Sequence, residues 1–295
     1  QTNTKEFFVT VLIKASGYSA IFFVAIIFYY LLSQGLPTLT EVDLKSLLSV
    51  RWYPIEDYFG ILPLITGSIV VTIGATLIAV PFGIGTAIYI AEIAPRWARE
   101  VLKPLIEVLA GLPSVVLGFI GIAVLASVLR ESLNLPTGLS ALTGSLLLGA
   151  ISIPTIVSVA EDALDAVPKE YRDGALALGG TKWQTIWTVI LPAARSGALT
   201  AVMLGIARSI GETMTVMMVT GNAPVLANSL KVFVSPVRTM TATIAAEMGE
   251  VANGSVHYHV LFFIGIVLFV ISFIVNVIAS SYVYRTSKRS EKLLS

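Results

Sequence analysis

Cysteine is absent from the 295-residue sequence, histidine occurs only twice, and 13% of the residues are charged. Without cysteine the chain can form no disulfide, thiolate metal site or cysteine nucleophile. No G-x-x-x-x-G-K-[ST] stretch occurs, so the chain lacks the phosphate-binding loop of that class of ATPase. The net charge of +1 indicates no bulk attraction to nucleic acid. Soluble domains carry about 25% charged residues, so the scarcity of charge is itself informative.

Apolar residues dominate instead: 56% of the chain is hydrophobic, and its mean hydropathy is +0.86. They come in long blocks nearly free of charge, and about 20 such residues are enough for a helix to cross a membrane. The alternating ten-residue segments of membrane barrels are missing. The sequence therefore predicts an all-α membrane protein with six transmembrane helices. The spans are expected within Ala15–Thr40, Tyr58–Ala91, Val108–Leu129, Ser132–Ala160, Ser196–Leu230 and Val251–Tyr284.

Lysine and arginine are unevenly distributed between these blocks. Thirteen of the 19 lie in the N-terminal segment, in a loop around Arg96, between Glu161 and Arg195, or in the C-terminal tail, and five lie in the alternate loops. Because cytoplasmic loops carry the excess of Lys and Arg, both termini are expected in the cytoplasm. The first block is longer than a signal-peptide core and has no A-x-A site after it, so it is expected to remain as an anchor.

Three regions are expected along the chain. Residues 1–57 hold the first span and an outer loop, residues 58–284 form a permeation core of five spans, and residues 285–295 form a cytoplasmic tail. Within the core, residues 161–195 form a long cytoplasmic loop.

This loop is too long for a tight turn and too apolar for a disordered linker. Pro168 suits the first turn of a helix, and Gly179-Gly180 suits its end. A second, amphipathic helix is expected after Thr181, with apolar residues at three-to-four spacing, ending near Pro192. Two short surface helices, one with an apolar face, indicate an element that docks on a partner.

The loop also carries a spaced motif. It reads Asp173-Gly174-Ala175, three residues, Gly179, nine residues, Val189, one residue and Leu191-Pro192. It resembles the EAA loop of ABC importer permeases, with Asp, Gly and Val as departures from the pattern E-A-A, three, G, nine, I, one, L-P. The resemblance implies an ABC importer type I permease (MetI-like) architecture and a coupling helix that docks on a cytoplasmic ATPase subunit. The coupling residues that it implies are Asp173, Gly174, Ala175, Gly179, Leu191 and Pro192. A helix resting on lipid headgroups is the alternative.

Four further stretches resemble one branch of this family. They are FGILPLITGSIVVT at 59–72, PLIEVLAGLPSVVLGF at 104–119, ARSIGETMTVMMVTGNAP at 207–224 and VRTMTATIAAEMGE at 237–250. They are similar to PstC-type permease subunits of phosphate importers. The resemblance implies a heterodimeric pore with a PstA-type permease, two PstB-type ATPase subunits that hold ATP and Mg²⁺, and an external PstS-type phosphate-binding protein. No cofactor is expected on this chain, and nucleic acid is not an expected partner.

Arg208 and Glu212 are the only ionisable residues between Ser196 and Leu230. An arginine at mid-membrane costs roughly 2.5–3.5 kcal/mol, so a contact with a partner helix or a water-filled path is expected. On one continuous helix both residues share a side with small and polar residues. These are Gly197, Ala201, Gly205 and Thr215.

The planar fork of guanidinium donors matches the oxygens of phosphate. Arg208 is therefore a candidate for contact with an anion in transit, and Glu212, one turn on, is expected to pair with it when the path is empty. Ser114 and Thr215 are further candidates for the translocation pathway. The alternative for Arg208 and Glu212 is a purely structural ion pair or a bridge to a partner subunit.

An enzyme is not expected, because the chain has no cysteine, no histidine within a span and no paired acids at mid-membrane. ATP hydrolysis is expected on the partner. Two alternatives remain for the function: a permease for another oxyanion, such as sulfate or molybdate, and a membrane signalling scaffold. His257 and His259 are expected at the membrane interface, since two residues do not complete a metal site. In the last outer loop Arg238, Glu247 and Glu250 face either a solute-binding protein or solvent.

Overall fold

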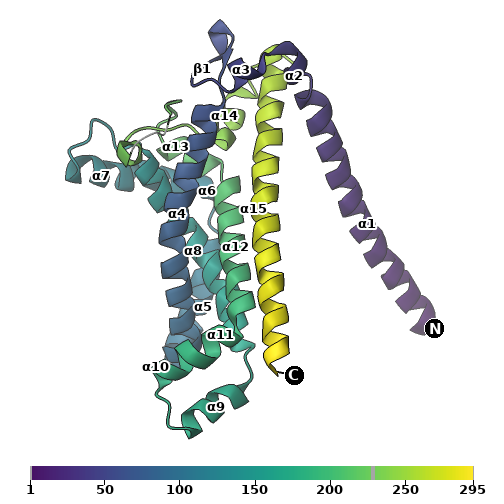
Figure 1. Cartoon of the computed structure of the whole chain (residues 1–295), viewed down its shortest axis with the longest axis vertical. Coiled ribbons are helices and arrows are strands. Elements are labelled where there is room, and N and C mark those ends of the chain that lie inside the picture. Colours follow the sequence, from purple (N-terminus) through teal and green to yellow (C-terminus); the bar gives the residue numbers. More distant parts are fainter. Residues whose placement is uncertain (1, 227–229, 295) are drawn as a thin grey trace.

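The computed structural model describes residues 2–226 and 230–294, and the chain is predominantly helical (Figure 1). Within these described residues, five helical stretches are long and apolar enough to cross a membrane: Glu6–Glu41, Leu62–Ile93, Ser114–Ser132, Ala141–Asp165 and Val256–Ser281. A sixth candidate is a pair of helical stretches, Lys182–Ala193 and Arg195–Gly211, bent by 74°. The all-α prediction is confirmed, and six spans are reached when the bent pair counts as one.

The elements follow in this order. They are α1 (Thr2–Gly35), α2 (Thr38–Glu41), α3 (Leu44–Leu47), β1 (Trp52–Tyr53), the 3-10 turn η1 (Pro54–Glu56), β2 (Tyr58–Phe59), α4 (Leu62–Ile88), the π-helical turn η2 (Tyr89–Ile93), α5 (Arg96–Ala110), α6 (Ser114–Ile120), the π-helical turn η3 (Gly121–Ala126), α7 (Ser127–Ser132), α8 (Ala141–Asp165), α9 (Lys169–Ala177), α10 (Lys182–Thr185), the π-helical turn η4 (Ile186–Ile190), α11 (Leu191–Ala193), α12 (Arg195–Gly211), α13 (Met214–Val219), the 3-10 turn η5 (Leu230–Val234), α14 (Met240–Glu247) and α15 (Val256–Leu294).

The core lies where α8 packs between α4 and α12. Small residues let these helices approach closely. A Cβ atom on Gly83 of α4 would lie 2.7 Å from Ile156 of α8, and one on Gly205 of α12 would lie 2.5 Å from it. The buried Ile156 therefore occupies the space that two glycines leave on neighbouring helices.

The two ends of the bundle differ in character. Figure 1 shows α9 and α10 at one end of the bundle and the hairpin β1–β2 at the opposite end. The first residues of α1 and the last residues of α15 lie toward the end with α9 and α10. We name the end with α9 and α10 the basic end, because it also carries Arg99, Lys103 and Arg172. The hairpin pairs Trp52 with Phe59 in antiparallel register and buries both rings.

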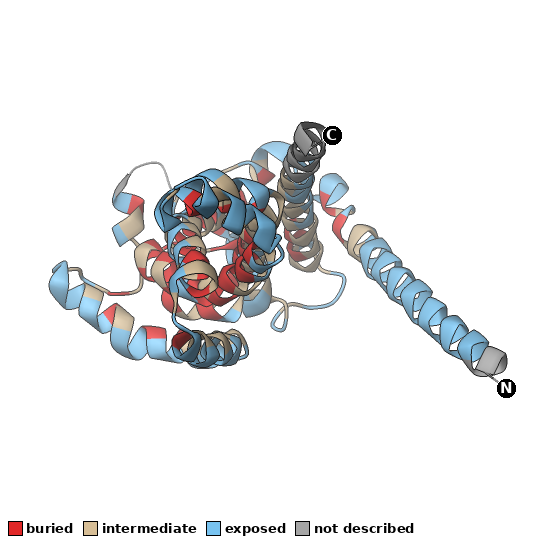
Figure 2. Ribbon diagram, turned by 90° about the horizontal axis from the view of Figure 1, so that it is seen from below, coloured by how far each residue is buried: buried red, intermediate tan, exposed pale blue. Residues whose placement is uncertain are grey.

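Helix α1 stands apart from this core. The C-terminal part of α1 packs on α15, where the ring centroids of Phe28 and Phe269 lie 4.9 Å apart. Figure 2 shows buried residues gathered in the bundle of α4, α8 and α12, whereas α1 is exposed over most of its length. An apolar helix with this exposure fits a lipid-facing or subunit-facing span.

Two expectations about helix limits are wrong. The residues around Arg96 are not a loop, because they begin the 15-residue helix α5, which precedes the span expected within Val108–Leu129. The fifth span is not a single helix, since α12 ends at Gly211 and α13 begins at Met214. The region 285–295, expected as a tail, continues α15 as far as Leu294.

The close packing of α4 predicts a contrast between two of its glycines. A Cβ on Gly67 would lie 2.3 Å from the carbonyl oxygen of Arg238, whereas a Cβ on Gly85 meets nothing within 4 Å. Gly67→Ala should therefore lower the thermal unfolding temperature of the detergent-solubilised protein, because overpacking reduces the free energy of unfolding by about 1–3 kcal/mol. Gly85→Ala, the matched control, should leave it unchanged or raise it, because alanine favours helix by about 1 kcal/mol. Equal melting temperatures for the two variants would contradict this packing.

Candidate functional site

Arg208 lies in the last turn of α12, inside a candidate span, and is half-buried. Its Nη1 donates to Oγ1 of Thr155 on α8 at 2.9 Å, and its Nη2 donates to the carbonyl oxygen of Ala110 at 3.4 Å. A guanidinium has five N–H donors. These two bonds hold the side chain in place and leave donors for a further acceptor.

Glu212 does not pair with Arg208. Among residues 2–226 and 230–294 no ion pair joins the two, although one had been expected. The physical reason is that the helix ends at Gly211, so that Glu212 has extended backbone angles (φ −68°, ψ 128°) and the one-turn geometry is lost. Its Oε1 instead accepts from the backbone N–H of Thr215 at 3.3 Å, in the first turn of α13.

The break in α12–α13 also removes the predicted stripe along one helix. Gly197, Ala201, Gly205 and Arg208 remain on α12, but Thr215 belongs to α13. The hydroxyl of the buried Thr215 donates to the carbonyl oxygen of Ser114 at 3.0 Å.

All four predicted pathway residues nevertheless meet in one place. Residues 111–113 separate α5 from α6, and residues 212–213 separate α12 from α13. Arg208 contacts Ala110 at the end of α5, and Thr215 contacts Ser114 at the start of α6. Two broken helices therefore face each other, and Arg208, in the last turn before one break, contacts the last residue before the other. Irregular backbone at membrane depth is tolerated where it is buried in protein or lines a cavity.

The predicted docking helices form as expected. Helix α9 begins after Pro168, and α10 begins after Thr181, whose side chain and that of Gln184 make a capping box. Between them Gly179 adopts φ +87°. Its N–H donates to the carbonyl of Leu176, and the N–H of Gly180 donates to that of Ala175, which closes α9 in a Schellman motif.

These helices present apolar side chains to the outside. Leu178 is 91% exposed, and Trp183 and Trp187 are exposed beside each other, with ring centroids 5.7 Å apart. We name these three residues with Leu176 the docking surface. The motif residues Asp173, Gly174, Gly179 and Pro192 are exposed next to it, whereas Ala175 and Leu191 are partly buried.

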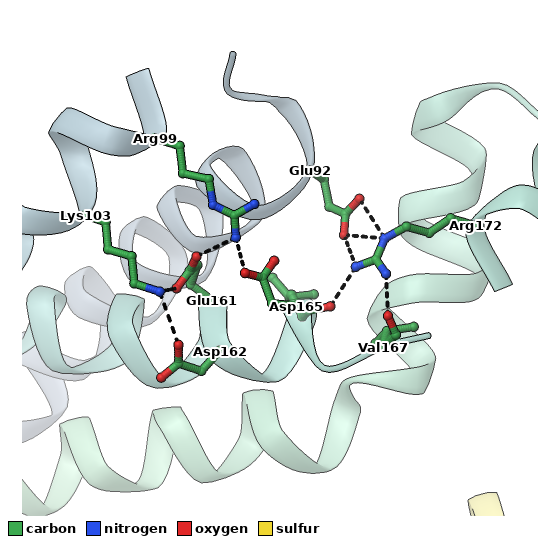
Figure 3. Close-up of polar contacts among 9 residues, drawn as sticks. Glu92, Arg99, Lys103, Glu161, Asp162, Asp165, Val167 and Arg172 are labelled. Carbon is green, nitrogen blue, oxygen red and sulfur yellow. Dashed lines mark hydrogen bonds and ion pairs between the residues drawn. The ribbon is translucent and has the colours of Figure 1, made fainter. Parts of the chain in front are cut away.

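Arg172 ties α9 to the rest of the molecule, a contact that sequence analysis missed (Figure 3). Its Nη2 lies 2.7 Å from Glu92 Oε1 in η2 and also donates to the carbonyl oxygen of Leu164 at 2.7 Å. Its Nη1 donates to the carbonyl of Val167. One side chain thus binds η2, which follows α4, and the C-terminal end of α8 with the residues just after it.

A second cluster joins α5 to α8 (Figure 3). Glu161 of α8 is 2% exposed, and its two carboxylate oxygens accept from Arg99 and Lys103, each at 2.8 Å. Arg99 also pairs with Asp165, and Lys103 lies 3.4 Å from the exposed Asp162. The signal in the sequence is an acid at the end of an apolar span together with two cations four residues apart.

A third cluster lies at the opposite end of the bundle. Glu247 accepts from Arg238 at 2.6 Å, from His257 at 2.8 Å and from Trp52 Nε1 at 3.1 Å. Glu247 and Arg238 are therefore bound to each other within the chain, whereas Glu250 is exposed. His259 contacts Glu41 at 2.8 Å.

Neighbouring charges and hydrogen bonds change the pKa of the Glu247 carboxyl. Burial raises the pKa of Glu247, but the bond from His257, the charge of Arg238 and the bond from Trp52 outweigh it, so the pKa lies below its ordinary value. A carboxyl with a lowered pKa in the folded state contributes stability that is lost as the pH falls.

Comparison with known proteins shows the family to which the chain belongs. The model described as "Binding-protein-dependent transport system inner membrane component" matches residues 79–288. The chain belongs to this family. It is thus an inner membrane component of an ABC importer, and its relatives are permease subunits, not enzymes.

Individual relatives agree. The chain is 44% identical to "Probable ABC transporter permease protein YqgH" of Bacillus subtilis over 78% of its length and 74% of that protein. It is 35% identical to "Phosphate transport system permease protein PstC" of Xylella fastidiosa over 82% of its length and 79% of that protein. An inward-facing structure of the MetNI methionine ABC transporter superposes with a TM-score of 0.57 at 17% identity, over 77% of this chain and 94% of that one, and shows the shared fold.

The Schellman turn predicts a local effect in α9. Gly179→Ala places a residue with a Cβ atom in the left-handed backbone region, which destabilises the turn by about 1–2 kcal/mol. Because α9 then opens more often, amide hydrogens of residues 169–178 should exchange roughly tenfold faster. Gly174→Ala is the matched control, because Gly174 is also open to solvent but lies within the helix. Hydrogen-exchange mass spectrometry should show slower exchange for this control. Faster exchange in both variants would contradict the assigned turn.

The Glu247 cluster predicts a pH dependence of stability. Its contribution is complete above the ordinary glutamate pKa of about 4.3 and is lost as the pH falls through the lowered folded-state value. Glu247→Gln should therefore lower the melting temperature at pH 7 and have a smaller effect near pH 3. Glu250→Gln, on the exposed neighbour, is the control and should change little at either pH. A Glu247→Gln deficit that is the same at both pH values would refute this assignment.

Proposed function

We propose that the chain is a PstC-type permease subunit of an ATP-driven importer of inorganic phosphate. The observation that carries the proposal is Arg208, a half-buried guanidinium within a span, held by Thr155 and Ala110 where two helix breaks meet. The relatives named as phosphate transport permeases support the choice of solute.

Phosphate fits the chemistry of this place. Near neutral pH it carries between one and two negative charges, and its oxygens accept from a guanidinium in pairs. Glu212 points its carboxylate to the first turn of α13 rather than to Arg208, so the cation is not neutralised by it. An anion that arrives at the breaks therefore meets an uncancelled positive charge.

The docking surface supports the proposal that an ATPase subunit binds this chain at its basic end. Exposed Leu178, Trp183 and Trp187 on two short helices suit a groove of another protein better than water. The partners that we propose are two PstB-type ATPase subunits at this surface, a PstA-type permease beside the spans and a PstS-type binding protein at the opposite end. ATP and Mg²⁺ are then held by the ATPase subunits, and the basic end faces the cytoplasm.

Substitution of Arg208 tests the solute contact. In proteoliposomes with the partner subunits and binding protein, Arg208→Gln should abolish ATP-dependent uptake of labelled phosphate while the complex still assembles and hydrolyses ATP. Arg208→Lys keeps the charge but loses the paired donors, so it should restore uptake partly at most. If sulfate or molybdate competed with labelled phosphate as strongly as unlabelled phosphate does, the chain would serve oxyanions in general, and the choice of phosphate as its solute would be contradicted.

The double variant Arg208→Gln, Glu212→Gln separates a contact with the anion from a structural pair. Because the bonds of Glu212 are made to Thr215 and not to Arg208, neutralising both residues should leave uptake abolished. Recovery of near-normal uptake in the double variant would show that Arg208 only balances the charge of Glu212, and would overturn its role in the pathway.

A further inference from the structure

The β1–β2 hairpin, with the residue before it, covers residues 51–59 and projects from the end of the bundle opposite the basic end (Figure 1). We propose that its exposed face is the place where the external solute-binding protein docks on this chain. The inference rests on the proposed function, because that function includes a binding protein at this end. It adds the docking residues and the chemistry of the surface that meets them.

One face of the hairpin is anchored in the molecule. Trp52 and Phe59 pair across the two strands and are buried, and Trp52 Nε1 donates to Glu247 at 3.1 Å. At the base of the hairpin the N–H of Gly60 donates to the carbonyl oxygen of Arg51 at 2.9 Å. The projection is therefore held by its strands, by packing and by a side-chain bond. A surface that is ordered in advance loses little freedom when a partner binds it.

The opposite face of the hairpin is turned to the outside. Because side chains alternate along a strand, Tyr53 and Tyr58 lie on the side away from the buried pair, and both are exposed. Ile55, in the turn η1 between the strands, is 86% exposed. The guanidinium of Arg51 lies 4.2 Å from the ring centroid of Tyr58 and pairs with Glu56 at 3.1 Å. We name Arg51, Tyr53, Ile55 and Tyr58 the hairpin face.

The hairpin face has the composition of a protein-binding surface. Among the large apolar side chains of the described residues, only Leu178 of the docking surface is more exposed than Ile55. Tyrosine and arginine are enriched where proteins bind each other, and an anchor that fills a pocket of the partner carries much of the binding energy. Ile55, with two tyrosines and an arginine around it, is such an anchor.

The charge of the hairpin favours a protein over a membrane as its partner. Segments that rest on a membrane surface are rich in Lys and Arg on their polar side. Residues 51–59 contain one cation and two acids, and that cation, Arg51, is already paired with Glu56. The exposed Asp57 leaves the tip net negative. An acidic tip of this kind fits an apolar pocket that is bordered by lysine or arginine.

A soluble external protein is the partner that can reach this surface. The family of the chain is described as binding-protein-dependent, and the proposed binding protein lies outside the membrane. The hairpin precedes Leu62, where the span α4 begins, and points away from that span (Figure 1). A second permease packed along the spans therefore leaves the hairpin face open for the binding protein.

Affinity for the binding protein tests the role of Ile55. The assembled transporter is placed in nanodiscs, and the Kd of the purified, phosphate-loaded PstS-type protein is measured by surface plasmon resonance. Ile55→Asp should raise this Kd about thirtyfold or more, because it brings a charge into an apolar pocket. Ile55→Leu keeps the apolar volume and should bind nearly as the parent does. Leu44→Asp is the matched control and should leave the Kd unchanged, since Leu44 is 57% exposed on α3, outside the hairpin.

The acidic tip predicts how fast the two proteins associate. Asp57 has φ +58°, in the left-handed region that Asn tolerates, so Asp57→Asn removes the charge and keeps the turn. This variant should associate more slowly at low salt, with a weaker salt dependence, because charges at the rim of an interface act mainly on association. An association rate that rises or stays the same would contradict a basic border on the partner.

A photocrosslink identifies what lies against the hairpin face. The chain has no cysteine, so Ile55→Cys and the control Leu44→Cys each give it a single thiol for a benzophenone maleimide. Irradiation in the presence of the binding protein should join residue 55 to that protein, with a much higher yield than residue 44. A crosslink from residue 55 to lipid, to the second permease or to another copy of this chain instead would overturn the proposal.

The affinity results separate the hairpin from the proposed function. Unchanged affinity in Ile55→Asp, or an equal loss in Leu44→Asp, would overturn the assignment to the hairpin face while the parent transporter still binds the protein and imports phosphate. Failure of the proposed function has a different signature, because the parent itself would then neither bind the phosphate-loaded protein nor import labelled phosphate. Both proposals would fall in that case, whereas the first result removes only the hairpin.

Discussion

A positive charge inside an apolar bundle has to be solvated by the protein itself, and the surroundings of Arg208 are arranged around this constraint. Helix breaks free backbone groups that water cannot reach in a membrane. Here side chains satisfy two of them: Arg208 binds the carbonyl of Ala110, and Thr241 binds that of Glu212. Thr215 adds a bond to the carbonyl of Ser114 at the start of α6. The breaks and the guanidinium stabilise each other, so the pathway candidates gather where the helices are interrupted.

The basic end follows a different rule. There a buried carboxylate, Glu161, receives two cations, and a partly buried cation, Arg172, receives a carboxylate and two carbonyls. Such contacts contribute less to net stability than to geometry, because desolvation offsets most of the attraction. Their effect is to join α4, α5, α8 and α9 into one block.

Local rules predicted most of the fold. The spans followed from apolar length, the docking helices from Pro168, Thr181 and the Gly179 turn, and the family from the spaced motif between Asp173 and Pro192. The prediction of an ion pair between Arg208 and Glu212 was wrong, because a four-residue spacing brings side chains together only while the helix continues. Nothing in the run from Gly205 to Val216 marks the end of α12 more strongly than Gly211, a residue that membrane helices tolerate.

By itself, then, the sequence determined the class of the protein, the apolar stretches that make its spans and the two short helices that carry the docking surface. These depend on hydrophobic length, capping and turn chemistry, which act within a few residues of each other. Tertiary structure alone decided that Glu161 receives Arg99 and Lys103, that Arg172 reaches Glu92, and that Ala110 lies against Arg208. These partners, 58 to 98 residues apart, are chosen by how α8 packs between its neighbours, and no local pattern encodes that packing.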